Sequence, residues 1–163
     1  VDSCAKLIDK NFKLHLVVAG DGNNREFLEA YAKKKLKNEN VLFLGKIPRH
    51  ELYRYYSAAD VFSYPGIEEY PGRKHIEAQS CGLPVVSYKN WGAEKTVIHK
   101  KTGLLPSYSD GSFLSEAISE ILINDRVRKS MQDETKKHIK LHHDLIKNYT
   151  LIEKYSTEFI TGI

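Results

Sequence analysis

Two glutamates, Glu69 and Glu77, are the residues of this sequence whose type and spacing could best do chemistry. Seven residues separate them, and the segment around Glu69 holds two prolines and two glycines, which predict a turn-rich loop. Carboxylates accept paired hydrogen bonds, so both side chains suit the neighbouring hydroxyls of a sugar or a ribose. Taken singly, Glu69 is better explained as a charge at a loop tip, and Glu77 as an acid that stabilises the start of a helix. The two acids together with a glycine turn and a helix start, all after one strand, favour a site.

A helix is predicted to begin near Arg73 and to run to Ser80, because Gly82 and Pro84 follow and both residue types end helices. The N–H groups of its first turn, together with the helix dipole, favour an anion. Arg73 and Lys74 add positive charge there, so a diphosphate suits this position. His75 lies beside the acids in the chain and is either a substrate contact or a surface residue of the helix.

The elements that must position these residues alternate between short apolar runs and segments of helical period. The apolar runs are 14–19, 41–44, 61–64, 84–87 and 103–105. Several are continuously hydrophobic, which is typical of parallel strands covered on both faces. Helices are predicted over 25–37, 51–59, 112–123, from Asp125 through Met131, and over 144–159. The alternation predicts an α/β fold, a Rossmann-like parallel sheet with helices on both faces.

Ligands of such folds bind beyond the carboxyl ends of the strands. Gly20 and Gly22 follow the first predicted strand, and Gly45, Lys46 and Ile47 follow the second. Glycine allows a ligand or another backbone to approach closely, but on the glycines alone an ordinary turn is the favoured interpretation.

Composition sets the class of protein. The chain has 163 residues, 41% hydrophobic and 28% charged, which is the globular range and large enough for one core. The apolar runs are too short to span a bilayer, and the first residues lack the pattern of a signal peptide. A net charge of +4 fits anionic small molecules or a membrane surface but is too weak to indicate nucleic-acid binding. Cys4 and Cys81 cannot build a disulfide scaffold, so a reducing, cytoplasmic setting is expected.

Other reactive side chains favour structural interpretations. His138 and His142 have the spacing of a metal-binding pair on a helix, with His143 beside them, but the Lys-rich flanks favour a solvated helix. We therefore expect no metal. Cys81 is expected to be packed rather than nucleophilic. Tyr53, Tyr55 and Tyr56 are expected to pack in a helix rather than to stack on a base.

The ordered motifs resemble the C-terminal, donor-binding domain of the GT-B retaining glycosyltransferases, specifically glycosyltransferase family four of group 1. That family shows a pattern like P-S-x-x-E-G-F-G-x-x-x-x-E-A followed by G-x-P-V-V. The chain has PGIEEYPG at 65–72, Glu77-Ala78, and GLPVV at 82–86. VVAGDG (17–22), VLFLGKI (41–47), WGAE (91–94) and KTGLL (101–105) match further family elements in order.

The resemblance implies a role for each matched position. Glu69 would bind hydroxyls of the transferred sugar, and Glu77 would hold the ribose hydroxyls of the nucleotide. Backbone around Pro71, Gly72 and Arg73 would face the sugar and the diphosphate. Backbone near Lys46 and Ile47 would border the base. The implied reaction moves a hexosyl-type sugar from a nucleotide-diphosphate sugar with retention of configuration, without an essential metal or other cofactor.

Several positions depart from the family pattern. Tyr70-Pro71 replaces Gly-Phe, and Pro71 has no N–H to donate. Gly66 replaces the family's Ser, and Trp91 replaces the first glycine of a Gly-Gly pair.

The family's preceding strand, with the Arg and Lys that grip the diphosphate, has no counterpart in the chain. We therefore expect a single sugar-nucleotide-binding domain over 1–163, with a C-terminal helix at 144–163, from a two-domain enzyme about twice as long. The strands at 14–19 and 61–64 would then flank a gap or pair directly. We also ask whether Arg73 or Lys74 partly replaces the family's cations.

The resemblance also implies partners. A nucleotide sugar would be the donor, and a glycan or lipid-linked acceptor would be bound through the other domain, as in polysaccharide biosynthesis. The full enzyme could associate peripherally with a membrane. The alternative is a non-catalytic module of the same fold that binds a nucleotide or a protein. A phospho-receiver domain fits poorly, because Asp21 alone does not make its acidic cluster.

Overall fold

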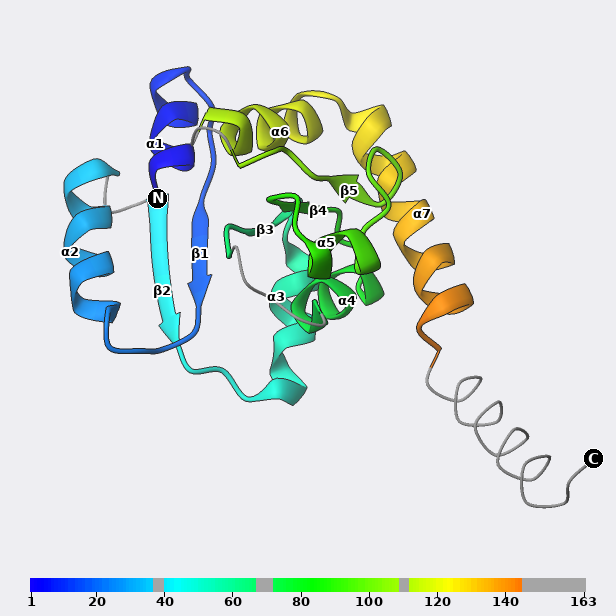
Figure 1. Ribbon diagram of the computed structural model, residues 1–163. Helices are drawn as coiled ribbons and strands as arrows, with labels where there is room; N and C mark the ends of the chain where they lie inside the picture. Colours follow the sequence, from blue (N-terminus) through cyan, green and yellow to red (C-terminus); the bar gives the residue numbers. More distant parts are fainter. Residues whose placement is uncertain (37–39, 67–71, 109–111, 145–163) are drawn as a thin grey trace, which may run out of the picture.

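The computed structural model describes residues 1–36, 40–66, 72–108 and 112–144 (Figure 1). Its elements follow the predicted alternation of strands and helices. They are, in chain order, α1 (Asp2–Asp9), β1 (Leu16–Ala19), α2 (Arg25–Lys35), β2 (Val41–Gly45), the 3₁₀ helix η2 (Arg49–Glu51), α3 (Leu52–Ala58), β3 (Phe62–Tyr64), α4 (Arg73–Ser80), β4 (Val85–Ser87), α5 (Trp91–Thr96), β5 (Gly103–Leu104), α6 (Ser112–Ile123) and α7 (Asp125–His142).

The predicted α/β class is confirmed, and the five strands fall within or beside the five apolar runs. All described strand pairs are parallel, but they form two sheets, β1-β2 and β3-β4-β5. In Figure 1 the β1-β2 pair stands apart from the other three strands. Of the two arrangements expected for the strands at 14–19 and 61–64, the described residues show the separated one.

Strand β4 is covered on both faces, as continuous hydrophobicity predicts. Val86 belongs to one core cluster with Ile118 and Ile121 of α6, and Val85 belongs to a second with Ala78 of α4 and Ala93 of α5. Neighbouring residues of a strand point to opposite faces, so the two clusters lie on the two sides of the sheet. The three-stranded sheet is therefore the centre of the fold, with α4 and α5 on one face and α6 on the other.

The β1-β2 pair departs from the prediction of strands covered on both faces. Val17 is 47% exposed and its partner in register, Leu42, is 54% exposed. Among the described residues, one face of this two-stranded sheet is therefore open. The prediction failed because the hydrophobic pattern of a strand does not state how many layers cover it. A hydrogen bond of 2.7 Å from the Tyr31 hydroxyl of α2 to the Asp2 carboxylate ties α2 to α1.

Two helices bury fewer of their predicted apolar residues than expected. Ala32 of α2 and Leu36, the residue that caps its end, are buried, but Leu28 is 41% exposed. In α3, Tyr56 packs against the second core cluster, whereas Tyr55 is 38% exposed and Tyr53 is 54% exposed. The prediction that the three tyrosines pack is therefore confirmed for Tyr56 and wrong for the other two. Short helices at the edge of a fold cover too little sheet to bury a whole stripe.

The prediction for α7 is wrong in two respects. The helix continues beyond Met131 to His142, and its N-cap is Asn124, whose Oδ1 accepts a 3.1 Å hydrogen bond from the Val127 amide. Asp125, the predicted cap, is instead the first residue of the helix. The solvated helix expected around His138 and His142 is the continuation of this helix, which contacts α4 and α6 through a narrow stripe that includes Thr135.

By contrast, α6 matches its prediction. Leu114, Ala117, Ile118 and Ile121 are all buried in the first core cluster. The predicted helix at 144–159 lies outside the described residues apart from its first position. Among the described helices, none is both long enough and apolar enough to span a bilayer.

Candidate functional site

The predicted helix over Arg73–Ser80 is confirmed as α4, and its cap explains a glycine. Gly72 is the N-cap, in the left-handed region with φ 53°, and its carbonyl accepts a 3.0 Å hydrogen bond from the His75 amide. A Cβ at this position would lie 2.7 Å from Thr96 Oγ1 and 3.0 Å from the Gly92 carbonyl oxygen. Glycine is required here both by the backbone conformation and by the close approach of α5.

Glu77 lies on the second turn of α4, where an ion pair holds it. Its Oε1 is 3.0 Å from Arg49 of η2, the short helix after β2. The Glu77 side chain is 26% exposed, so the carboxylate remains accessible at the surface of the fold. The first turn of α4 carries no acid, so the interpretation of Glu77 as an acid that stabilises the helix start is not supported.

Arg49 is the residue that the sequence interpretation missed. It follows Lys46 by three residues in the segment after β2 and lies far from Glu77 in the chain. A signal was present, since both residues follow strands of a parallel fold and such ends share one edge. The ion pair therefore brings the segment after β2, with Lys46 and Ile47, toward α4.

The turns after β1 and β2 contact each other. The Gly20 amide donates a 2.8 Å hydrogen bond to the Gly45 carbonyl oxygen, and Gly45 has a φ of 68°. These bonds support the ordinary-turn interpretation of Gly20 and Gly45. Gly22 accepts an amide hydrogen bond from Arg25 through its carbonyl, at the start of α2. A role of these glycines, or of Lys46 and Ile47, in donor binding stays a prediction.

The two cations at the start of α4 differ in their surroundings. Lys74 donates a 3.2 Å hydrogen bond to the Tyr64 hydroxyl, and its amine lies 4.4 Å from the centre of the Tyr64 ring. Its charge is therefore directed to the end of β3, just before the loop that contains Glu69. Arg73 is exposed to solvent. Whether either cation meets a diphosphate stays a prediction.

His75 is fully buried, so its interpretation as a surface helix residue is wrong. Thr96 Oγ1 lies 3.0 Å from the Gly92 carbonyl oxygen and 3.1 Å from His75 Nδ1, so the hydroxyl bonds both α5 and the buried ring. The ring packs edge-on against Tyr64 with 5.6 Å between centroids. His75 therefore joins α4 to α5 and β3, which its position among polar residues did not reveal. Its predicted contact with substrate stays a prediction.

Glu69 and Pro71 lie outside the described residues, so the roles expected of them are not tested. Two surface hollows of the described chain lie elsewhere and include none of the predicted donor residues. One is lined by Arg25, Glu29, Lys33 and Val41–Phe43, and the other by Lys100, Asn124, Arg126, Val127, Ser130 and Met131. Neither hollow is lined by a residue of α4. Cys81 is half-buried after α4.

Comparisons with known proteins fit this architecture. The family model described as "Glycosyl transferases group 1" matches residues 1–138. The chain is 32% identical over 123 residues to the GDP-mannose-dependent alpha-(1-6)-phosphatidylinositol monomannoside mannosyltransferase of Mycolicibacterium smegmatis, across 71% of this chain and 32% of that protein. The chain spans about a third of the length of the curated relatives it matches.

Two solved structures share the fold. Sucrose-phosphate synthase from Thermosynechococcus elongatus superimposes with a TM-score of 0.85 at 24% identity, over 99% of this chain and 42% of that chain. The C-terminal domain of a group 1 glycosyl transferase (LpcC) from Francisella tularensis has a TM-score of 0.78 at 15% identity, over 88% of this chain and 77% of that chain. Both likenesses show the parallel α/β fold. The chain belongs to the group 1 glycosyl transferase family.

Proposed function

We propose that the chain is the C-terminal, donor-binding domain of a retaining glycosyltransferase of family four. The enzyme would move a hexosyl-type sugar from a nucleotide-diphosphate sugar to a glycan or lipid-linked acceptor. The placement is supported by the likeness to the C-terminal domain from Francisella tularensis. The donor and acceptor classes are supported by the relative from Mycolicibacterium smegmatis, which is named for GDP-mannose and a phosphatidylinositol acceptor.

The observation that carries the proposal is the position of Glu77. It lies on the helix that follows β3, accessible at the surface, and it is held by Arg49 from the segment after β2. One carboxylate oxygen binds Arg49, which leaves the other oxygen for the ribose hydroxyls. The same pairing sets the distance between α4 and the backbone of Lys46 and Ile47, which would border the base.

The remaining contacts follow along α4. The amides of Gly72 and Arg73 at its start would face the diphosphate, with the charges of Arg73 and Lys74 nearby. Pro71 lacks an N–H, so Gly72 and Arg73 would supply more of the donors. Glu69 would accept hydrogen bonds from hydroxyls of the sugar. The protein's contribution would be mainly to position the donor and to stabilise the charge of the leaving diphosphate.

The chemistry of retention fits such a site. The bond from the anomeric carbon to the diphosphate oxygen breaks, and the acceptor hydroxyl oxygen bonds to the same face of that carbon. The acceptor proton passes to the departing diphosphate, so charge balances without a metal or other cofactor. The acceptor would be bound by another domain of the enzyme. We expect a cytoplasmic enzyme with at most peripheral attachment to a membrane.

Isothermal titration with UDP, GDP and their sugars tests the proposal. One of these ligands should bind, and Glu77→Ala should weaken that binding about tenfold, since it removes a charge-assisted hydrogen bond. Glu120→Ala on the exposed face of α6 is the control and should bind like the unmodified chain. Absence of binding by every nucleotide, or equal binding by Glu77→Ala, would contradict the donor-site proposal and favour a non-catalytic module.

A further inference from the structure

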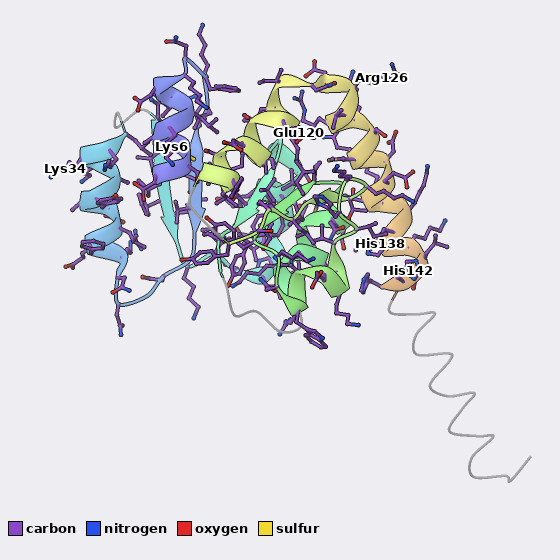
Figure 2. The ribbon with its side chains drawn as sticks, turned by 45° about the horizontal axis from the view of Figure 1, so that its top comes forward. Lys6, Lys34, Glu120, Arg126, His138 and His142 are labelled. Atoms are coloured by element: carbon purple, nitrogen blue, oxygen red, sulfur yellow. The ribbon has the colours of Figure 1, made fainter. Side chains whose placement is uncertain are left out.

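Three histidines gather at the C-terminal end of α7. The ring of His138 lies 5.1 Å from that of His142 and 5.3 Å from that of His143, centroid to centroid. Figure 2 shows His138 and His142 one turn apart near the end of the helix. Among the described residues, no three His, Cys, Asp or Glu side chains are arranged to hold a metal ion. Metal binding therefore does not explain why the three rings lie together, and a solvated helix does not explain the position of His138.

His138 joins α7 to α5 rather than facing solvent. Its Nε2 lies 3.2 Å from the Thr96 carbonyl oxygen, which also accepts a 2.8 Å hydrogen bond from Gln79 Nε2 of α4. A carbonyl oxygen can only accept, so Nε2 of His138 carries a proton. In the neutral ring Nδ1 is then bare, and it is buried without a hydrogen-bond partner among the described residues.

The contact leads directly to the start of α4. The Gln79 amide also donates to the His75 carbonyl oxygen at 3.2 Å, and Thr96 Oγ1 meets both His75 Nδ1 and the space beside Gly72. The backbone of Thr96 is thus held from one side by His138 and from the other by Gln79. Displacement of His138 would loosen the residues that fix the Gly72 cap.

The groups around His138 disfavour its charged form. From α7 itself it faces His142 and His143; α4 contributes the neutral amide of Gln79, with His75 beyond it, and α5 contributes the Thr96 carbonyl. Three further charged residues belong to this part of the fold. The Lys136 side chain lies over Gly82, the charge of Lys101 lowers the pKa of Glu134, and Asp144 follows His143 in the chain. The Thr96 hydrogen bond favours a charged ring, but burial first, and then His143 and His142, lower the pKa of His138.

We propose that His138 is a positioning residue for the start of α4, and that protonation of His138 releases the end of α7 and loosens the Gly72 cap. Its functional meaning rests on the proposed function, because α4 carries the candidate donor site. A proton on buried Nδ1 finds no acceptor among the described residues and is repelled by two neighbouring rings, so the charged ring is more stable in water.

Hydrogen exchange of the amides of His75 and Ile76, which both donate to the Gly72 carbonyl, tests the proposal without any nucleotide when it is expressed as protection factors. Between about pH 7.5 and 5.5, protection in the unmodified chain should fall by up to about tenfold per pH unit, the limit for one titrating group. His138→Gln keeps an amide donor for Thr96 and does not titrate. It should retain protection and lose the pH dependence, whereas His138→Ala should show low protection at both pH values.

His142→Gln is the matched control on the same helix, since His142 is exposed and the histidine that meets the Thr96 carbonyl is His138. It should keep the pH dependence. Protection that is equal at both pH values in the unmodified chain, or a full pH response in His138→Gln, would overturn the proposal. If no nucleotide binds but protection follows pH as stated, the donor-site proposal fails while the role of His138 stands.

Discussion

The guanidinium of Arg49 lies 3.0 Å from the carboxylate of Glu77, and this ion pair joins the segment after β2 to the second turn of α4. The two residues belong to different strand–helix units. Their contact is therefore a tertiary constraint on the candidate site. Variants of this pair can separate an effect on ligand binding from an effect on folding.

Arg49→Ala should reduce nucleotide affinity more than it reduces stability. The Arg49 side chain is 72% exposed, and exposed ion pairs contribute about 0.5 kcal/mol or less. We expect an unchanged melting temperature and a three- to tenfold weaker affinity, roughly the range for loss of orientation of one charged contact. Calorimetric titration and thermal unfolding measure the two effects. A large drop in melting temperature with unchanged affinity would show that the pair is structural.

Gly72→Ala should destabilise the fold by about 1–3 kcal/mol. The left-handed backbone costs about 1–2 kcal/mol for a residue with a Cβ, and the new atom would press on Thr96 and Gly92. Gly22→Ala is the control, because a Cβ there meets nothing within 4 Å. Urea unfolding should separate the two variants clearly. Equal stability of both would mean that the cap conformation adapts at little cost.

Ile121→Ala should cost about 2–5 kcal/mol, since it opens a cavity in a fully buried part of the first core cluster. Leu42→Ala removes a similar side chain that is 54% exposed and should cost far less. The comparison, made by chemical denaturation, tests the open face of the β1-β2 pair. A cost for Leu42→Ala near that of Ile121→Ala would show that this face is covered in solution.

Asn124→Ala should lower stability by about 1 kcal/mol, because it removes the side-chain acceptor for the Val127 amide at the start of α7. Asn124→Asp keeps an acceptor oxygen and should retain most of the stability. Asp125→Ala, at the position predicted from the sequence, should have a smaller effect. The order of the three melting temperatures is the measurement, and a greater loss for Asp125→Ala than for Asn124→Ala would contradict the assignment of the cap.

Global stability should fall as the pH decreases through about 6.5. Burial is the main cause that lowers the pKa of both His138 and His143 in the folded chain. Between those lowered values and the ordinary value near 6.5 the unfolded chain binds more protons, so acid favours unfolding. Carboxylates titrate at lower pH, which keeps the window distinct. Urea unfolding between about pH 7.5 and 5.5 measures the slope, and His138→Gln should reduce it.

The sequence by itself determined the α/β class, the approximate positions of all five strands and the bounds of α4, because local hydrophobic runs and breakers such as Gly82 and Pro84 act over a few residues. It also gave the family resemblance that the family model now supports. It placed the apolar stripe of α6 correctly, since that stripe is continuous and the helix is buried along one face.

Only the tertiary structure decided which surfaces are covered and which distant residues meet. The sequence predicts that Val17 and Leu42 are buried strand residues, yet both face solvent, because the elements that would cover a strand come from elsewhere in the chain. The pairing of Arg49 with Glu77 and the bonds that join His138 to Thr96 cross long stretches of chain, so no local pattern encodes them. A side chain's neighbours in space are set by the packing of whole elements, and its own sequence context records little of that packing.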